Sequence, residues 1–170
     1  MNQAQIHLAL NHAPLFLSVL SGILLIISII KKNELVKSIA LFGMLAAALF
    51  TLPVYFTGEG TEEIVEKFGV NEKAIEEHED FATISMIIIS ITGFIALLAL
   101  MLRNRLANLS SVLVTGLVIL SLASFGTMAW TAHLGGLIRH TELAGVNAGT
   151  QNENGTKVDQ TNEKEGKDDD

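Results

Sequence analysis

The chain has 170 residues, a net charge of −7, no cysteine and 49% hydrophobic residues, and its mean hydropathy is +0.45. The missing cysteines exclude disulfides and thiolate metal sites, and no basic patch points to a nucleic-acid partner. Such a composition is not that of an ordinary soluble domain, because the hydrophobic residues are gathered in four long uncharged runs.

Each of the four runs is long enough to cross a lipid bilayer as a helix. The hydrocarbon core is about 30 Å thick and requires about 20 apolar helical residues. Without water, the backbone must satisfy its own hydrogen bonds, which favours helices. We therefore predict an all-α, up-down-up-down four-helix transmembrane bundle over residues 1–143. The spans are expected at about 13–30, 37–56, 81–102 and 108–132.

The distribution of charge predicts the orientation. The first span has no positive region before it and is followed by Lys31 and Lys32, which is the reverse of a cleavable signal peptide. The links KKNELVK and RNR are basic, whereas the link between the second and third spans holds nine acids and two lysines. The positive-inside rule then predicts a multi-pass protein of the bacterial inner membrane, with an uncleaved first span and both termini outside.

The acidic link is expected to contain structure of its own. The stretch TEEIVEKFG predicts a short amphipathic helix that ends at Gly69. Asn71 is then a good N-cap for a third long helix over about 72–102, and the fourth is expected over about 108–142. With a first helix that begins near Ala4, the bundle is expected to project beyond the membrane on its outer side only.

The C-terminal segment 144–170 is predicted to be a disordered acidic tail. Residues 151–170 hold seven acids and three lysines, with Val158 as the one apolar side chain. Such a segment buries too little apolar surface to offset the entropy lost on ordering.

All five histidines lie near the outer ends of the predicted spans: His7, His12, His78, His133 and His140. A rise of about 1.5 Å per residue places His7, His78 and His133 at one depth, with Glu59 close to them. The neighbours of His78 at three and four residues form an apolar stripe, so His78 is expected to face the bundle. His133 is expected to face it too, with His7 in the same layer and His12 in a flanking slot.

Imidazoles that face inward from three helices are costly to bury without partners, although a single histidine is more often structural. Two chemistries fit the set. Haem b takes two imidazoles, one on either side of the ring, and His133 with either His78 or His7 could supply them. A transition metal (Cu, Zn or Fe) would take His7, Glu59, His78 and His133. His12 and His140 complete the candidate cofactor-binding residues.

No nucleophilic triad, phosphate loop or nucleotide fingerprint is present. The expected role is therefore redox or metal handling in contact with the bilayer, with a membrane or periplasmic electron-transfer partner, rather than an enzyme. The competing hypothesis is a cofactor-free structural or accessory subunit that docks a partner through its acidic outer cap. Arg139 and Glu142 are expected to clamp the fourth helix to that cap. Whether the protein forms a homo-oligomer is left open by the sequence.

Three motifs stand out: the Gly-Glu-x-x-Glu-Glu run at 58–63, His78 followed by Glu79, and the Gly-Gly-x-Ile-Arg-His-x-Glu run at 135–142. In these motifs the chain resembles a family of small bacterial four-span membrane proteins of unknown function. The resemblance covers about residues 7–143. It implies a four-helix membrane fold and a shared outer constellation of Glu59, His78, Arg139 and His140, but no particular ligand.

Overall fold

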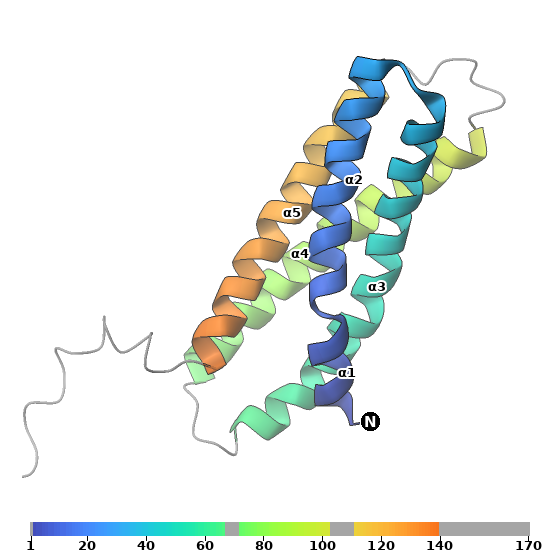
Figure 1. Ribbon diagram of the computed structural model, residues 1–170. Coiled ribbons are helices and arrows are strands. Elements are labelled where there is room, and N and C mark those ends of the chain that lie inside the picture. Colours follow the sequence, from blue (N-terminus) through green and yellow to red (C-terminus); the bar gives the residue numbers. More distant parts are fainter. Residues whose placement is uncertain (1, 67–71, 103–110, 140–170) are drawn as a thin grey trace, which may run out of the picture.

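The computed structural model describes residues 2–66, 72–102 and 111–139. Every element in these ranges is a helix: α1 (Gln3–Leu10), α2 (His12–Lys31), α3 (Glu34–Glu66), α4 (Glu72–Leu102) and α5 (Ser111–Arg139). The four long helices pack in a closed ring, α2 to α3 to α4 to α5 and back to α2, and α1 packs mainly against α3 (Figure 1). The predicted all-α four-helix bundle is confirmed. Four segments are long and apolar enough to cross a membrane.

The first span is divided into α1 and α2 at Asn11. Pro14 lacks the N–H that would bond to the Leu10 carbonyl, and its ring crowds that carbonyl, so the helix is interrupted there. The start of α1 is fixed by a capping box, in which Asn2 and Gln5 exchange side-chain and backbone hydrogen bonds at 2.9 and 3.1 Å. The N-terminal segment therefore forms a separate short helix that lies beside α3.

A tight turn joins α2 to α3 and makes them antiparallel neighbours. Lys32 adopts the left-handed conformation with φ of 49°, and the Asn33 N–H bonds to the Ser28 carbonyl at 3.1 Å. The Asn33 side chain then accepts hydrogen bonds from the backbone of Leu35 and Val36, which caps α3. We call this end of the bundle, with Lys31, Lys32 and Lys37, the lysine end. The opposite end, with α1 and the start of α4, is the histidine end.

The α3 helix is longer than expected, because it runs without interruption from Glu34 to Glu66. The prediction of a separate short helix in the stretch TEEIVEKFG is therefore wrong at its start, since Gly58 and Gly60 do not end α3. The α4 helix has the predicted bounds, and the described part of α5 falls within the predicted 108–142. Gly69, Asn71 and the tail 144–170 lie outside the described residues.

Each long helix presents a seam of buried residues that recur in alternating steps of three and four. His78 and Ala82, both part-buried, fill the interval between Ile75 and Ser85. A mean repeat of 3.5 residues is the geometry of left-handed, coiled-coil-like helix packing. The seam residues are Pro14, Ser18, Ser21, Leu25 and Ser28 in α2; Ala40, Met44, Ala47, Thr51 and Val54 in α3; Ile75, Ser85, Ile89, Thr92, Ala96 and Ala99 in α4; and Val114, Leu117, Ser121, Ser124, Met128 and Thr131 in α5.

Many seam residues are small or carry hydroxyls, and these bind the helices together. Thr92 Oγ1 lies 3.1 Å from Ser124 Oγ, and Ser121 Oγ donates to the Ser18 carbonyl at 2.7 Å. Gly93 lets α4 approach α3 so closely that a Cβ there would collide with Ala48. Small residues and interhelical hydrogen bonds are the usual means of packing helices in a membrane, where lipid is as apolar as the side chains.

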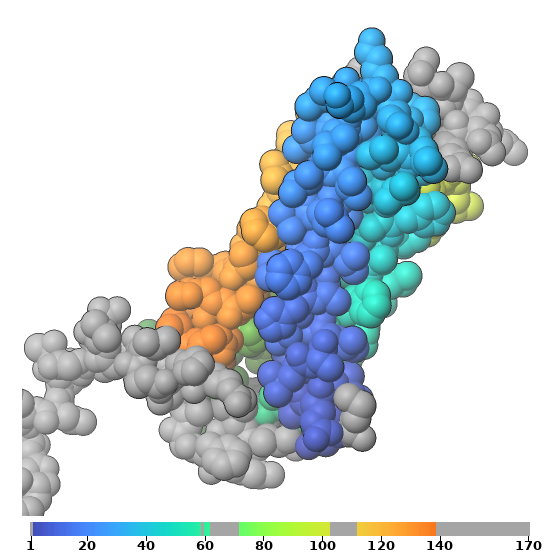
Figure 2. Space-filling view, in the orientation of Figure 1, coloured from blue at the N-terminus to red at the C-terminus, as the bar shows by residue number. Residues whose placement is uncertain are grey.

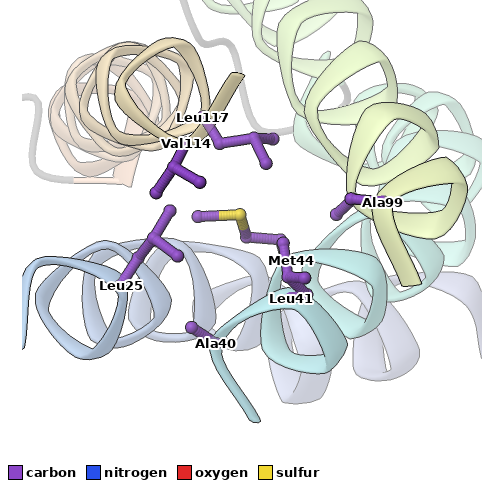
Figure 3. Close-up of a cluster of buried hydrophobic side chains, with 8 residues drawn as sticks. Leu25, Ala40, Leu41, Met44, Ala99, Val114 and Leu117 are labelled. Atoms are coloured by element: carbon purple, nitrogen blue, oxygen red, sulfur yellow. The ribbon is translucent and has the colours of Figure 1, made fainter. Parts of the chain in front are cut away.

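The lysine end of the bundle is closed by an apolar core. Leu25, Met44 and Leu117 converge there from three helices, as Figure 3 shows, together with Val114 and Ala99. The outside of the bundle is equally apolar: Phe16, Phe42, Phe56 and Phe94 are each about 60% exposed or more. Figure 2 shows one such outer face, formed by α1 and α2 with α3 beside them. An apolar exterior of this extent is suited to lipid.

Candidate functional site

His7 projects from α1 onto α3. Its Nδ1 atom lies 2.9 Å from the carbonyl oxygen of Val54, and the side chain is part-buried. The ring passes beside Gly58, where a Cβ would lie 3.6 Å from Cε1 of the imidazole. That separation is ordinary van der Waals contact. The imidazole thus ties the short α1 helix to the backbone of α3.

His78 makes the corresponding contact between α4 and α5. Its Nδ1 atom lies 2.9 Å from the carbonyl oxygen of Thr131. The ring is pressed against Gly135, where a Cβ would come within 3.0 Å of Cε1. Just below it in the seam, the hydroxyls of Ser85 and Thr131 lie 3.0 Å apart. The prediction that His78 faces the bundle is confirmed.

The two histidines use the same local arrangement. Each Nδ1 bonds to a carbonyl, and the residue four positions later in that helix is a glycine: Val54 with Gly58, and Thr131 with Gly135. A helical carbonyl already accepts the N–H at that fourth position, but it has a second lone pair for the imidazole. A glycine there leaves room for the flat ring to lie along the helix surface and reach that lone pair.

These bonds determine which ring nitrogen carries the proton. A carbonyl oxygen can only accept, so Nδ1 must be the donor in both histidines. In the neutral ring Nε2 then holds a free lone pair, and within the described part of the chain neither Nε2 has a hydrogen-bond partner. A backbone carbonyl on Nδ1 is the arrangement that commonly orients a metal-ligating histidine.

His133 does not join this pair, and the prediction that it faces the bundle is wrong. The buried seam of α5 passes through Thr131, whereas His133 is exposed two residues later. Its ring contacts Trp130, with centroids 5.4 Å apart, and Trp130 in turn contacts Phe81 at 6.2 Å. His133 therefore belongs to an aromatic cluster on the outside of the bundle, where tryptophan is typical of the membrane–water interface.

His12 also lies outside. It is exposed and stacks on Phe16, four residues later on the same helix, with ring centroids 6.3 Å apart. It does not occupy the flanking slot that was expected beside His7, because the seam of the first span passes through Asn11 and Pro14.

The remaining candidates are only partly described. The backbone of Glu59 lies in α3 next to Gly58, and that of Arg139 ends α5, but their side chains fall outside the described part of the chain. His140 and Glu142 lie beyond the described residues, so the Arg139–Glu142 clamp stays a prediction. Within the described ranges, no group of three or more histidine or carboxylate side chains is placed to hold a metal ion.

Sequence reasoning did not find the backbone half of this site. No sequence pattern marks the carbonyls of Val54 and Thr131. The position of His78 does have a sequence signal, because it falls on the alternating steps of three and four that form the α4 seam. Reasoning also missed Asn11, whose Oδ1 atom is buried without a hydrogen-bond partner among the described residues, one helical turn after His7. The candidate site thus consists of two anchored imidazoles, His7 and His78, together with the unsatisfied Oδ1 of Asn11, four residues after His7.

No protein-family model, no curated protein and no solved structure matches the chain. The resemblance through residues 58–63 and 135–142 stays a prediction. What the chain does must therefore be inferred from the site itself.

Proposed function

We propose that this multi-pass membrane protein is an electron-transfer module that binds b-type haem through His7 and His78. The observation that supports it is the pair itself. His7 and His78 lie on separate helices at the histidine end, and each is anchored through Nδ1 with Nε2 left free. Paired imidazoles from different helices are a common way to hold haem iron.

The number of ligands favours haem over a mononuclear metal. A Zn or Cu site usually needs three or four protein ligands, and the described part of the chain offers no such group. A haem needs two, because the porphyrin supplies the other four nitrogens. Copper, zinc or non-haem iron would require further ligands, such as Glu59 or His140.

The protein's part in this function is to position the ligands. Hydrogen bonds from Nδ1–H to the carbonyls of Val54 and Thr131 fix the rotation of the rings and make Nε2 a better electron donor. A bound haem would supply one-electron chemistry, and no side chain need act as an acid or a base. Asn11 lies one helical turn after His7, and its buried Oδ1 has no hydrogen-bond partner among the described residues. An unsatisfied acceptor at this place supports a site whose ligand is still to be bound.

A second function has an observation in its favour. The same hydrogen bonds join α1 to α3 and α4 to α5, so the histidines could act only as clamps in a cofactor-free accessory subunit. Such a subunit would dock a partner through the acidic first turns of α4, where Glu72, Glu76 and Glu79 are exposed.

Absorption spectroscopy of the purified protein separates the two functions. The haem function predicts a Soret band that shifts on reduction with dithionite. His78→Asn places an amide nitrogen at the position of Nδ1 and removes Nε2, so it should keep the bond to Thr131 and lose most of the band. His133→Ala, which removes an exposed histidine outside the pair, is the matched control and should keep it.

The clamp function predicts the opposite pattern. The protein would be colourless when purified from cells that make haem, His78→Asn would be as stable as the parent, and His78→Ala would be less stable. A Soret band that survives in both His7→Asn and His78→Asn would also contradict the proposed ligands.

We further propose that the histidine end faces the outside of the bacterial inner membrane. Lys31, Lys32 and Lys37 gather at the lysine end, whereas exposed acids such as Glu76 and Glu79 gather at the histidine end. Basic residues next to membrane spans favour the cytoplasmic side.

A further inference from the structure

Two prolines interrupt neighbouring helices close to each other in space. Pro14 follows the border between α1 and α2, and Pro53 lies inside α3. An apolar groove of about 190 Å³ is lined by Leu10, the last residue of α1, and by Leu49, Phe50 and Pro53 of α3. The end of α1 therefore adjoins the proline turn of α3, and one hinge axis can pass through both interruptions.

Each proline weakens the helix in which it lies. A proline lacks the N–H that would bond to the carbonyl four residues earlier, and its ring crowds that carbonyl. In α3 the Thr57 hydroxyl also donates to the Pro53 carbonyl at 2.6 Å, and such side-chain bonds often bend a helix. Figure 1 shows the last turns of α3 bending away from the line of the earlier turns. Proline is the commonest cause of such a kink.

The segments beyond the two prolines are tied to each other. These segments are α1 and residues 54–66 of α3, which we call the hinged unit; the body is the rest of the bundle. The His7 ring bonds to the Val54 carbonyl at 2.9 Å. Gln3 lies so close to Gly60 that a Cβ there would collide with the Gln3 side chain. A movement of α1 must therefore carry the end of α3 with it.

The hinged unit packs only lightly against the body. No residue of α1 is buried, and the buried seam of α3 stops at Val54, because residues 55–58, 60 and 61 are all part-buried or exposed. Among the described residues, one hydrogen bond joins the hinged unit to α4, between Tyr55 Oη and Thr83 Oγ1 at 3.1 Å. Segments with few buried side chains open at a lower free-energy cost than the core of a fold.

We propose that the hinged unit rotates as one piece about Pro14 and Pro53, and that the hydrogen bond between Tyr55 and Thr83 holds it closed. A few residues at a hinge absorb the change in backbone angles, while the helices on either side keep their structure. Loss of one net hydrogen bond should then shift the balance toward the open form about fivefold.

The rotation has a consequence for the two histidines, and this consequence rests on the proposed function. His7 belongs to the hinged unit, whereas His78 is bound to the Thr131 carbonyl in the body. The rotation therefore changes the separation of the two proposed haem ligands. Haem held by both imidazoles would keep the hinged unit closed.

Double electron–electron resonance measures the rotation in nanodiscs, because a chain without native cysteine accepts spin labels at chosen positions. Leu8→Cys on α1 and Ile84→Cys on α4 place one label on the hinged unit and one on the body. Ile23→Cys and Ile91→Cys form the control pair within the body, and all four native residues are exposed. We expect two distances for the first pair, the longer one less populated, and one distance for the control. A control pair with the same two distances would contradict a hinge.

Rotation as one piece requires the end of α3 to follow α1. A label at Thr61→Cys in α3, paired with Ile84→Cys, should therefore report the same ratio of two distances as the label on α1. A single distance for this pair, beside two for the α1 pair, would restrict the movement to α1 and overturn the hinged unit.

Two variants test the closing bond and the hinge. Tyr55→Phe removes one hydroxyl and should raise the ratio of the longer to the shorter distance about fivefold. Thr127→Val, which removes a hydroxyl that bonds only within α5, is the control and should leave the ratio unchanged. Pro53→Ala restores an N–H to α3 and should lower the ratio. A distance distribution that neither Tyr55→Phe nor Pro53→Ala alters would overturn the proposal.

The spin-label distances and the Soret band are separate readouts. Two distances in a protein without haem absorption would support the hinge and contradict the proposed function. In protein with bound haem, ligation by both His7 and His78 should leave the shorter distance alone. Two distances in the haem-bound protein would contradict the link between the hinge and the ligands.

Discussion

The imidazole of His78 lies so close to the backbone of Gly135 that a Cβ at this position would come within 3.0 Å of the ring. The next residue, Gly136, is exposed, and a Cβ there would meet nothing within 4 Å. The two adjacent glycines therefore differ in what an added methyl group would meet: the imidazole of His78 at Gly135, and nothing at Gly136. That difference makes them a matched pair for experiment.

Gly135→Ala is expected to lower stability relative to Gly136→Ala by about 1 kcal/mol, roughly one net hydrogen bond. The added methyl pushes the ring away from the Thr131 carbonyl, whereas at Gly136 alanine only improves helix propensity. Unfolding of the two variants in mixed detergent micelles measures the difference. Equal stabilities would mean that His78 moves aside without cost and that its bond to Thr131 contributes little.

Much of this fold follows from the distribution of charge along the sequence. The uncharged runs predict four helices because a bilayer leaves the backbone few other ways to satisfy its hydrogen bonds. The inward direction of His78 also follows from the apolar stripe around it. The continuity of α3 does not, because the bundle holds Gly58 and Gly60 in a helix that their propensity alone would not favour.

The error over His133 has a physical cause. His133 lies seven residues before His140, on a face with glycines, and this pattern indicates an inward His133 only if hydroxyl side chains stay out of the core. In a membrane bundle they do: Ser121, Ser124 and Thr131 occupy the buried seam. Reading serine and threonine as core residues would have placed His133 outside.

The close approach of α4 to α3 at Gly93 should be intolerant of added volume. A Cβ at Gly93 would collide with Ala48 and lie 3.4 Å from the Met44 carbonyl, so α3 and α4 would have to separate. Gly93→Ala is expected to cost about 1–3 kcal/mol, as in other overpacked cores. Gly116→Ala on α5, where a Cβ meets nothing within 4 Å, is the control. Equal unfolding free energies for the two variants would contradict this packing.

The buried hydroxyl pair of Thr92 and Ser124 should show measurable coupling between α4 and α5. The two oxygens lie 3.1 Å apart. A double-mutant cycle of Thr92→Val and Ser124→Ala is expected to give about 0.6 kcal/mol, a typical value for hydrogen bonds between membrane helices. Additive effects of the two substitutions on the unfolding free energy would show that the pair contributes nothing of its own.

Because the chain has no native cysteine, single cysteines can report the orientation without background. Lys32→Cys reports on the lysine end and Glu76→Cys on the histidine end, and both positions are exposed. If the basic turn is cytoplasmic, a membrane-impermeant maleimide added to intact spheroplasts should label Glu76→Cys, whereas Lys32→Cys should react only after permeabilisation. Labelling of Lys32→Cys alone in intact cells would reverse the orientation and place His7 and His78 on the cytoplasmic side.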